Sequence, residues 1–533
     1  MRVVATTSAG RLAGADAPAR TRAFPSVLRD PRRALVVALV ALSVIPCLDP
    51  VGDPDLWWHV RAGRWILDNR AFPRSEMFTY TAAGNPWTAH EWGSEVLFAI
   101  LSAAGGALLV GVVMALVTWS GLWALALRAR DRGAGWGVCA VAMLLGARAM
   151  QPVTGSRPQM LTFALCCWTL LLAERHLARG GRRVWLLPLI VAVWANLHAG
   201  FLFGIGLIAA VAGIEALRAI THRPGAFALR RVGELGAAVA ASVLAACINP
   251  YGPGLIAYAL RLTHEVSGLP IVEWMRPDPL SWGMAAADLL AVTMALLVLR
   301  GGRVEWRDAL LSVGGVVAAL IAVRNLAVLV AVALPAWAAL VQAALDRRPA
   351  ARAKHRPAPH VAIAILATAV AGVGVATARA AQAASAAGIA EREPVCATAL
   401  LARSPEALRL FAPYATSGYV IGALWPHATV YDYGELLAPG PQVLANDIRI
   451  AAGTTDSPSA MSLLDGSRTV AVLMVPGALT AELASSGGWM KALSDPTGME
   501  LWLRGDPAWA RRELLGGGQG EHRLSGLCPT WFA

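Results

Sequence analysis

The chain has 533 residues, of which 56% are hydrophobic and only 15% are charged, and its mean hydropathy is +0.54. A soluble protein carries about a quarter charged residues, so this balance excludes an ordinary soluble protein and indicates a membrane protein. The formal charge of +12 does not indicate a nucleic-acid partner, because the arginines lie in short loops between apolar runs, where they set orientation.

Residues 1–33 are rich in arginine, poor in acids and lack a small-residue cleavage site, so we expect a cytoplasmic tail rather than a signal peptide. A transmembrane domain is predicted over 34–378, because a helix that crosses the hydrocarbon needs about 20 apolar residues, or fewer inside a bundle. About eleven candidate spans follow one another, and two short ones, 134–149 and 184–196, leave the count open by one or two. The candidates are 34–48, 106–127, 134–149, 158–174, 184–196, 200–219, 232–248, 285–299, 308–323, 326–345 and 360–378.

Basic loops follow alternate spans and predict the orientation of the chain. They are 128–132, 174–183, 218–231, 300–308 and 346–356, and they fall on the same side as the arginine-rich N-terminus. The positive-inside rule therefore places the N-terminus in the cytoplasm. We expect a multi-pass protein of the inner (cytoplasmic) membrane. The outer segments are then 49–93, 150–157, 197–199, 249–284, 324–325 and 379–533.

The large first outer loop, 49–93, carries the densest polar cluster. Pro54 fixes its own φ and biases Asp53 towards an extended shape, so Asp53 and Asp55 stand on a stiff loop. These carboxylates fit a general base for an acceptor hydroxyl, or ligands that hold a divalent cation, Mg²⁺ or Mn²⁺, against a phosphate. The structural alternative is that Asp55 caps a helix beginning at Leu56, LWWHVRAGRWILDN.

Aromatic and basic residues accompany these acids. His59 lies four residues after Asp55 and shares its helical face, and Arg61 follows. Trp58 is a candidate platform for a sugar ring or an isoprenoid chain, although Trp57 and Trp58 also fit a membrane-interface belt. Residues 93–104 predict an amphipathic helix at the interface, because Glu95 would be costly at mid-membrane.

His90 and Glu91 precede Trp92 at a helix entry and are candidate substrate-binding residues. Glu91 is followed by Trp92-Gly93-Ser94, so the HExxH motif of zinc proteases is absent. His198 lies at an outer turn, where a lone histidine is more often a satisfied turn residue than a ligand. No Walker A or GxSxG motif supports ATP-driven transport or serine hydrolysis.

Arg324 and Asn325 form a short outer turn between two long apolar spans. An arginine at this rim is costly unless it pairs with an anion. The phosphate of a lipid substrate is one partner, through bidentate hydrogen bonds, and an ordinary lipid headgroup is the alternative. Glu273, Arg276 and Asp278 are weaker candidates, since a solvated loop explains them equally well.

Residues 379–533 change character and predict a small α/β domain outside the membrane. Apolar runs RLFA, ATVYDY, RTVAVLMV and GMELWLR alternate with the helix-like stretches ATSGYVIGAL, ALTAELAS and GWMKALS. Cys396 and Cys528 lie in this region and are a candidate disulfide pair if it faces an oxidising compartment; two free thiols are the alternative.

Motifs along the chain resemble a known superfamily. The series DPDLWWHVRAGRWIL, FPRSEMFTYTAAGNPW, HEW, NLHAGF, NPYG and SGYVI, over about residues 45–440, is similar to poorly characterised bacterial membrane proteins grouped with the C-type glycosyltransferases (GT-C). The turn reads NLHAGF where a second glycine is expected, and VYDYGE stands where the family carries an Asp-Gly-Arg run.

The resemblance implies a mainly α polytopic bundle and inverting transfer of a sugar from a polyprenyl-phosphate-linked donor on the outer face. Asp55 or Asp53 would be the general base, His59 or His90 would assist donor or metal binding, and Arg324 would hold the lipid phosphate. The acceptor, a glycan, lipid or protein, is left open. Two alternatives remain: a transporter or flippase for a lipid-linked sugar, which requires ionisable residues at mid-span, and a non-catalytic assembly or sensor protein.

Overall fold

The computed structural model describes residues 30–223, 225–266, 271–347 and 359–515. Most of the predicted tail, most of the loop 346–356 and Cys528 lie outside these ranges. The pairing of Cys396 with Cys528 therefore stays a prediction, and Cys396 itself is buried.

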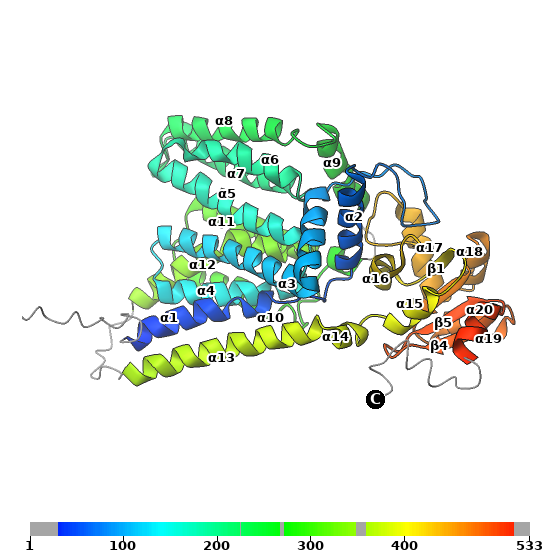
Figure 1. Ribbon diagram of the computed structural model, residues 1–533. Helices are drawn as coiled ribbons and strands as arrows, with labels where there is room; N and C mark the ends of the chain where they lie inside the picture. The colour runs from blue at the N-terminus through cyan, green and yellow to red at the C-terminus, as the bar shows by residue number, and fades with distance from the viewer. Residues whose placement is uncertain (1–29, 224, 267–270, 348–358, 516–533) are drawn as a thin grey trace, which may run out of the picture.

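Each of the eleven predicted spans overlaps a helix, because long apolar runs between arginine-rich loops satisfy their backbone hydrogen bonds as helices. These helices lie roughly parallel as a bundle (Figure 1). They are α1 (Pro31–Leu42), α3 (Trp92–Asp131), α4 (Trp136–Ala149), α5 (Gln159–Arg179), α6 (Leu186–Ala195), α7 (Phe201–Ile220), α8 (Leu229–Ala245), α10 (Ala285–Leu299), α11 (Trp306–Ile321), α12 (Leu326–Asp346) and α13 (Pro359–Ala383).

Among the described residues, five helices are long and apolar enough to cross a membrane by themselves. They include α3, α5, α7, α13 and the segment Val323–Asp346, while α4 and α10 are shorter apolar helices. The bundle is therefore that of a multi-pass membrane protein, and the count of eleven spans stays a prediction.

The expected interfacial helix at 93–104 exists as the first part of α3. The chain leaves helical geometry at Gly105 and at Gly106, whose φ of 64° belongs to the left-handed region that glycine tolerates. The segment before this kink lies across the end of the bundle beside α2 (Leu56–Asn69), whose bounds match the helix expected from the sequence (Figure 1).

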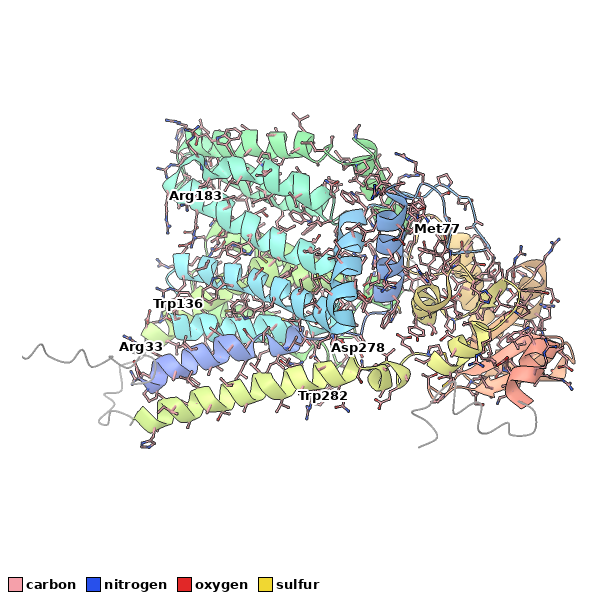
Figure 2. All side chains as sticks on the ribbon, viewed as in Figure 1. Arg33, Met77, Trp136, Arg183, Asp278 and Trp282 are labelled. Carbon is pink, nitrogen blue, oxygen red and sulfur yellow. The ribbon has the colours of Figure 1, made fainter. Side chains whose placement is uncertain are left out.

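Residues of the predicted inner and outer segments lie at opposite ends of the bundle. Figure 2 shows Arg33 and Arg183, from basic segments, at one end, and Met77 and Asp278, from outer segments, at the other. This separation is what the alternating loops predicted, and the side of the membrane that each end faces stays a prediction.

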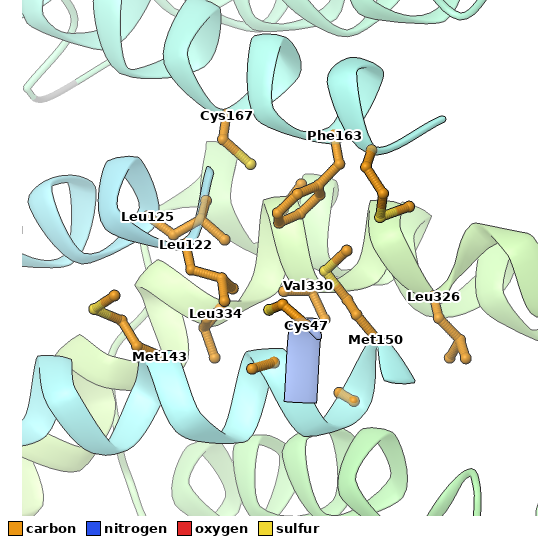
Figure 3. Close-up of a cluster of buried hydrophobic side chains, with 14 of the residues drawn as sticks. Cys47, Leu122, Leu125, Met143, Met150, Phe163, Cys167, Leu326, Val330 and Leu334 are labelled. Carbon is orange, nitrogen blue, oxygen red and sulfur yellow. The ribbon is translucent and has the colours of Figure 1, made fainter. Parts of the chain in front are cut away.

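The bundle is held by an apolar core between its central helices. Leu122, Leu125, Met143, Phe163 and Leu334 from α3, α4, α5 and α12 interlock there (Figure 3). Cys47 and Cys167 belong to the same core as free, buried thiols. A core of this kind fixes the relative positions of the helix ends, on which the outer segments depend.

The C-terminal region forms the predicted α/β domain around a five-stranded sheet of order β2-β1-β3-β5-β4. The first three strands run parallel, and β5 pairs antiparallel with β3 and β4. Strands are β1 (Leu408–Phe411), β2 (Ala428–Val430), β3 (Ala471–Met474), β4 (Trp489–Ser494) and β5 (Glu500–Arg504). Helices are α14 (Ala386–Ala390), α15 (Val395–Leu401), α16 (Tyr414–Leu424), α17 (Pro441–Ala451), α18 (Ala460–Gly466), α19 (Ala478–Ser485) and α20 (Ala508–Leu515).

One prediction in this domain is wrong. The stretch GWMKALS was expected to be helical, but Trp489–Ser494 is the edge strand β4. The segment follows two glycines and is too short to nucleate a helix, whereas pairing with β5 satisfies its backbone and sets Lys491 beside Glu500. Tertiary pairing thus overrides a weak local preference.

The first outer loop and the C-terminal domain share one hydrophobic core. Phe78 and Trp87 of the loop are buried together with Leu410, Ile421 and Val430 of the domain. The loop also adds backbone hydrogen bonds to β2, since the N–H of Tyr80 donates to the carbonyl of Val430 over 3.1 Å. The two regions therefore form a single packed unit beyond one end of the bundle, at the right in Figure 1.

Two glycines bring α16 against the loop that carries the acidic pair. A Cβ at Gly418 would stand 2.2 Å from the carbonyl oxygen of Pro54, and one at Gly422 would stand 2.9 Å from the Cβ of Trp57. Glycines spaced four apart lie on one helix face, so the backbone of α16 approaches this loop closely. The motif SGYVIG is thus the docking face of the domain.

Candidate functional site

All six predicted outer segments meet at one cavity of about 470 Å³. Asp55, Arg157, His198, Glu273, Arg324 and Glu435 each line it from a different one of these segments. Among the candidates chosen from the sequence, Asp55, Trp58, His59, His90, Glu91, His198 and Arg324 line the cavity, and Asp53 and Arg61 do not. Asp55 and Arg324 therefore share one site, as the sidedness of the sequence required.

Asp55 lies immediately before α2, at the cap position, but its side chain does not cap the helix. Its Oδ1 instead accepts a hydrogen bond from the indole Nε1 of Trp58 over 2.9 Å. The backbone N–H of Asp55 donates to Oδ1 of Asp53 over 2.9 Å. The capping alternative is thus wrong for Asp55, and its carboxylate faces the cavity.

Burial, reinforced by the negative charge of Asp53, raises the pKa of Asp55 from 3.8 to about 6. His59, Arg157 and the hydrogen bond from Trp58 oppose this rise. A general base works best when its pKa lies near the operating pH, because it is then both ionised and basic enough to accept a proton. Asp55 meets that requirement.

Asp53 is engaged elsewhere. It is buried and forms an ion pair with Nε of Arg157 through Oδ2. Since both of its oxygens are occupied, one by Arg157 and one by the N–H of Asp55, Asp53 positions the loop and Arg157. The structure therefore separates the two acids that the sequence left equivalent.

The same engagement bears on the expected divalent cation. Within the described ranges, His, Cys, Asp and Glu side chains form no group of three or more arranged to hold a metal ion. Both oxygens of Asp53 already have a partner, so the Asp53–Asp55 pair offers such an ion few free ligand atoms. The cation requirement stays a prediction, and no step proposed below uses a metal ion.

Three histidines converge on Glu91. Their Nε2 atoms lie 3.5 Å (His59), 3.2 Å (His90) and 3.3 Å (His198) from its carboxylate oxygens. Burial alone would raise the pKa of Glu91, but the charge and hydrogen bond of His90, then His198 and His59, outweigh burial and lower the pKa below its usual range. Glu91 is therefore ionised at neutral pH.

The protonation of two of these histidines follows from their partners. Nδ1 of His198 accepts the N–H of Gly200 over 2.9 Å, so its proton sits on Nε2 and faces Glu91. Burial first, and then the charges of His90 and Arg324, lower the pKa of His198 to about 4 despite Glu91. Burial also lowers the pKa of His90, but the negative charges of Glu91 and Glu435 outweigh burial and raise this pKa to about 9. At neutral pH His198 is neutral and His90 is a cation.

His59 connects this cluster to Asp55. Its ring stacks on Trp58 with centroids 3.7 Å apart, and its Nδ1 lies 3.8 Å from Oε1 of Glu95, beyond hydrogen-bond reach. Burial lowers the pKa of His59, but Glu95, Glu91 and Asp55 together raise it above its usual value. His59 Nδ1 and Glu95 Oε2 are both buried atoms with no hydrogen-bond partner. Glu95, which the sequence assigned only to an interfacial helix, therefore belongs to the site.

Both tryptophans contact other parts of the protein, with Trp58 buried and Trp57 half-buried, and a place for either in a membrane-interface belt stays a prediction. Trp58 is buried between His59 and Tyr433. Trp57 donates its Nε1 to Glu393 over 3.1 Å and packs edge-on against Tyr419. Of these two, only Trp58 lines the cavity, so its role as a platform stays a prediction that this position favours.

Arg61 points away from the cavity. Its guanidinium donates to the carbonyl of Trp425 and lies 5.8 Å from the ring of the same residue. Arg61 thus ties α2 to the C-terminal domain. Its expected role in substrate binding stays a prediction that this position does not favour.

The C-terminal domain contributes a wall of the cavity that the sequence did not predict. Gly434, Glu435 and Tyr414 line it. A Cβ at Gly434 would stand 2.0 Å from Oδ1 of Asp55, so only glycine lets this loop lie against the carboxylate. The hydroxyl of Tyr258 donates to Glu435 over 3.0 Å. The run VYDYGE, a departure from the family pattern, is therefore part of the site.

The site also holds two arginines. Arg157, which the sequence placed in an outer segment without a role, pairs with Asp53 and Glu273. Arg324 lies 3.7 Å from Glu273 and 3.8 Å above the ring of Trp274. No signal within the sequence links Arg157 to Asp53, because 104 residues separate them.

No protein-family model matches the chain, and no curated protein matches it. Solved structures do share its fold. ArnT from Cupriavidus metallidurans matches with a TM-score of 0.52 and 14% identity in the apo state, covering 88% of this chain and 96% of that chain. Its structure bound to undecaprenyl phosphate matches with a TM-score of 0.50 and 14% identity over 88% and 97% of the two chains.

Two further matches come from other organisms. The oligosaccharyltransferase of Archaeoglobus fulgidus, tethered with an acceptor peptide, gives a TM-score of 0.50 and 13% identity over 91% of this chain and 77% of that chain. The arabinofuranosyltransferase AftD from Mycobacteria gives a TM-score of 0.50 and 18% identity over 90% of this chain and 40% of that chain. All are GT-C glycosyltransferases, so the GT-C-like fold expected from the sequence motifs is confirmed. At these identities the likeness concerns the fold alone.

Proposed function

We propose that this GT-C-fold protein transfers a sugar from a polyprenyl-phosphate-linked donor to an acceptor at the outer face of the membrane. The observation that carries the proposal is the position of Asp55, a carboxylate with a pKa near 6, in the same cavity as Arg157 and Arg324. A base and an anion-binding group are the two elements that displacement of a sugar phosphate needs.

The lining of the cavity is divided in a way that suits both substrates. Met160, Phe163, Leu202, Phe203 and Val328 give an apolar wall, while Asp55, Glu91, His90 and the arginines give a polar one. An isoprenoid chain would lie against the apolar wall and its phosphate against the arginines. A hydrophilic acceptor would enter beside the C-terminal domain. The apolar helices of the bundle support the donor's location in the membrane.

The reaction is a single displacement at the anomeric carbon of the sugar. An acceptor hydroxyl oxygen forms a bond to this carbon, and its proton passes to the carboxylate of Asp55. The bond between the anomeric carbon and the phosphate oxygen breaks, and its electron pair leaves with the polyprenyl phosphate. The arginines stabilise the charge that develops on that phosphate. The configuration inverts, because attack comes from the face opposite the leaving group.

Structures with the same fold support the proposed substrates by analogy. ArnT has been seen with undecaprenyl phosphate, and the Archaeoglobus fulgidus oligosaccharyltransferase with an acceptor peptide. For this chain the donor class follows the first of these, while the sugar and the acceptor are left open.

The test is transfer of a radiolabelled sugar from polyprenyl-phosphate donors by the purified protein in lipid nanodiscs. We expect Asp55→Asn to lower the transfer rate by about 10²–10⁴-fold, because the acceptor loses its base. Asp68→Asn is the matched control, since Asp68 is exposed on the same helix α2 and does not line the cavity. It should keep the rate of the unmodified protein.

The rival functions give other results in this assay. A flippase would move the lipid-linked sugar between leaflets without forming a new glycosidic bond, and a scaffold would do neither. Equal transfer by Asp55→Asn and Asp68→Asn would exclude Asp55 as the base. Absence of transfer with every polyprenyl-phosphate sugar and acceptor class would contradict the proposed activity.

A further inference from the structure

Arg157 and Arg324 converge on the cavity from distant parts of the chain. Arg157 lies between η3 (Gln151–Val153) and α5, and Arg324 lies in the short helix η6 (Val323–Asn325). Their side chains keep 18% and 24% of their surface exposed, so both guanidiniums are accessible from the cavity. Two accessible guanidiniums on one cavity form an anion-binding site.

Glu273, in η5 (Val272–Trp274), fills the space between these arginines. One of its oxygens pairs with Nη1 of Arg157, and the other lies 3.7 Å from Nη1 of Arg324. A single carboxylate therefore lies close to both guanidiniums. A phosphate group offers the same arrangement, with several oxygens and a negative charge, to the same donors.

The two acids that contact Arg157 differ in accessibility. The Asp53 side chain is 1% exposed, does not line the cavity, and forms an ion pair with Nε of the guanidinium. The Glu273 side chain is 26% exposed and faces the cavity. Asp53 is therefore the fixed partner that orients Arg157, and Glu273 is the partner that a ligand from the cavity can replace.

Arg324 does not depend on Glu273 for its position. Its guanidinium lies 3.8 Å above the ring of Trp274, a stacking arrangement that holds a planar cation without an anion. When Glu273 leaves, Arg157 stays bound to Asp53 and Arg324 stays stacked on Trp274. Both then present free N–H groups to an incoming anion.

We infer that Glu273 is an internal competitor for the phosphate of the lipid-linked substrate, and that Arg157 and Arg324 together form the site for which both compete. The inference rests on the proposed function for the identity of the ligand, a polyprenyl phosphate. The bound phosphate takes over the contacts of Glu273, whose carboxylate turns towards solvent. Glu273 thus weakens binding of the substrate and eases release of the phosphate product.

The experiment measures equilibrium binding of undecaprenyl phosphate to the full-length protein in nanodiscs. We expect Glu273→Gln to bind it roughly tenfold more tightly, because the competing charge-assisted contact is lost while a polar side chain of the same shape is kept. Asp278→Asn is the control, because Asp278 is an exposed acid of the same segment and does not line the cavity. It removes the same charge and should bind like the unmodified protein.

Equal or weaker binding by Glu273→Gln, with thermal stability like that of Asp278→Asn, would overturn the inference. If Glu273→Gln lowers stability, Glu273→Asp decides instead: its shorter side chain cannot reach both arginines, so it should also bind more tightly, and unchanged binding would contradict competition. These outcomes are independent of catalysis. Tight binding without any sugar transfer would contradict the proposed function and leave the competition by Glu273 intact.

Discussion

The two ends of the helical bundle both bury charged groups, but they treat them differently. At the end with the basic loops, Glu174 accepts hydrogen bonds from Arg128 and Arg132 at 2.6–3.1 Å. Arg132 also holds Asp308 with two bonds of 2.7 and 2.8 Å. Each of these four side chains has its polar atoms paired, as buried charges require. In the adjacent Arg307, Nε is buried without a hydrogen-bond partner, although the guanidinium lies near Glu215 and Asp308.

At the opposite end the pairing is incomplete. His59 Nδ1 and Glu95 Oε2 are buried without hydrogen-bond partners, and Asp55 keeps a raised pKa beside Asp53. The imperfect set surrounds the cavity of about 470 Å³. Since unpaired buried polar groups cost stability, they persist where they serve another purpose.

The difference indicates that the charged groups at one end hold helices together, whereas those at the other end serve the proposed reaction. The paired network connects α3, α5 and α11 and holds these helices together. In the incompletely paired group, Asp55 and His59 line the cavity, which a substrate can fill, and Glu95 lies next to His59. The comparison therefore predicts opposite effects when a single carboxylate is neutralised at either end.

The largest effect on stability is expected from Glu174→Gln. This substitution leaves Arg128 and Arg132 without their shared counter-charge, which costs about 3–5 kcal/mol for a buried pair. Thermal unfolding in detergent would detect the loss. Glu305→Gln is the control, because the Glu305 side chain lies beside the same network but is 64% exposed, so its change should stay within about 0.5 kcal/mol. Equal stability of the two variants would remove the structural role assigned to this network.

Asp55→Asn should have the opposite effect on stability and make the folded protein more stable. Its pKa is raised from 3.8 to about 6 in the folded protein, mainly by burial, so the ionised form opposes folding. Because the folded protein holds the proton of Asp55 more tightly than the unfolded chain does, this group stabilises the fold fully below pH 3.8. The stabilisation is lost as the pH rises through 6. At pH 7.5 the neutral amide should therefore stabilise the fold by about 1–2 kcal/mol, allowing for partial solvent screening. Destabilisation by Asp55→Asn would show that the carboxylate supports the fold.

The smallest effect is expected from Glu95→Gln, through the pH dependence of transfer. Transfer should rise with pH through about 6, as Asp55 ionises. Glu95 favours protonated His59, and the His59 charge lowers the pKa of Asp55. Without the carboxylate the midpoint should move to higher pH by less than about one unit. Recovery of the original midpoint by Glu95→Asp would confirm that the charge is responsible, whereas an unchanged midpoint in Glu95→Gln would exclude this coupling.

Much of the fold was predictable because it depends on local pattern. Apolar run length located helices such as α10, over the predicted residues 285–299, and Asp55 with Leu56 marked the start of α2. Alternating basic loops predicted which segments share an end. The edge strand β4 was missed, since its conformation depends on pairing with β5 rather than on its own residues.

The site was predictable only in part, for the same reason. Asp55, His59, His90 and Glu91 lie within one loop, so their density was visible in the sequence. Arg157 and Gly434 reach the site only through tertiary packing, and nothing in their neighbours indicates it. The division of roles between Asp53 and Asp55 likewise depends on Arg157, so it needed the structure.

A cryo-EM structure of the protein with undecaprenyl phosphate tests the central assignment most directly. We predict phosphate density within hydrogen-bond distance of Arg157 and Arg324, with Glu273 displaced and the isoprenoid chain against the apolar wall that includes Phe163 and Phe203. Phosphate density in the arginine-lined cavity at the other end of the bundle, beside Arg175 and Arg303, would contradict the account.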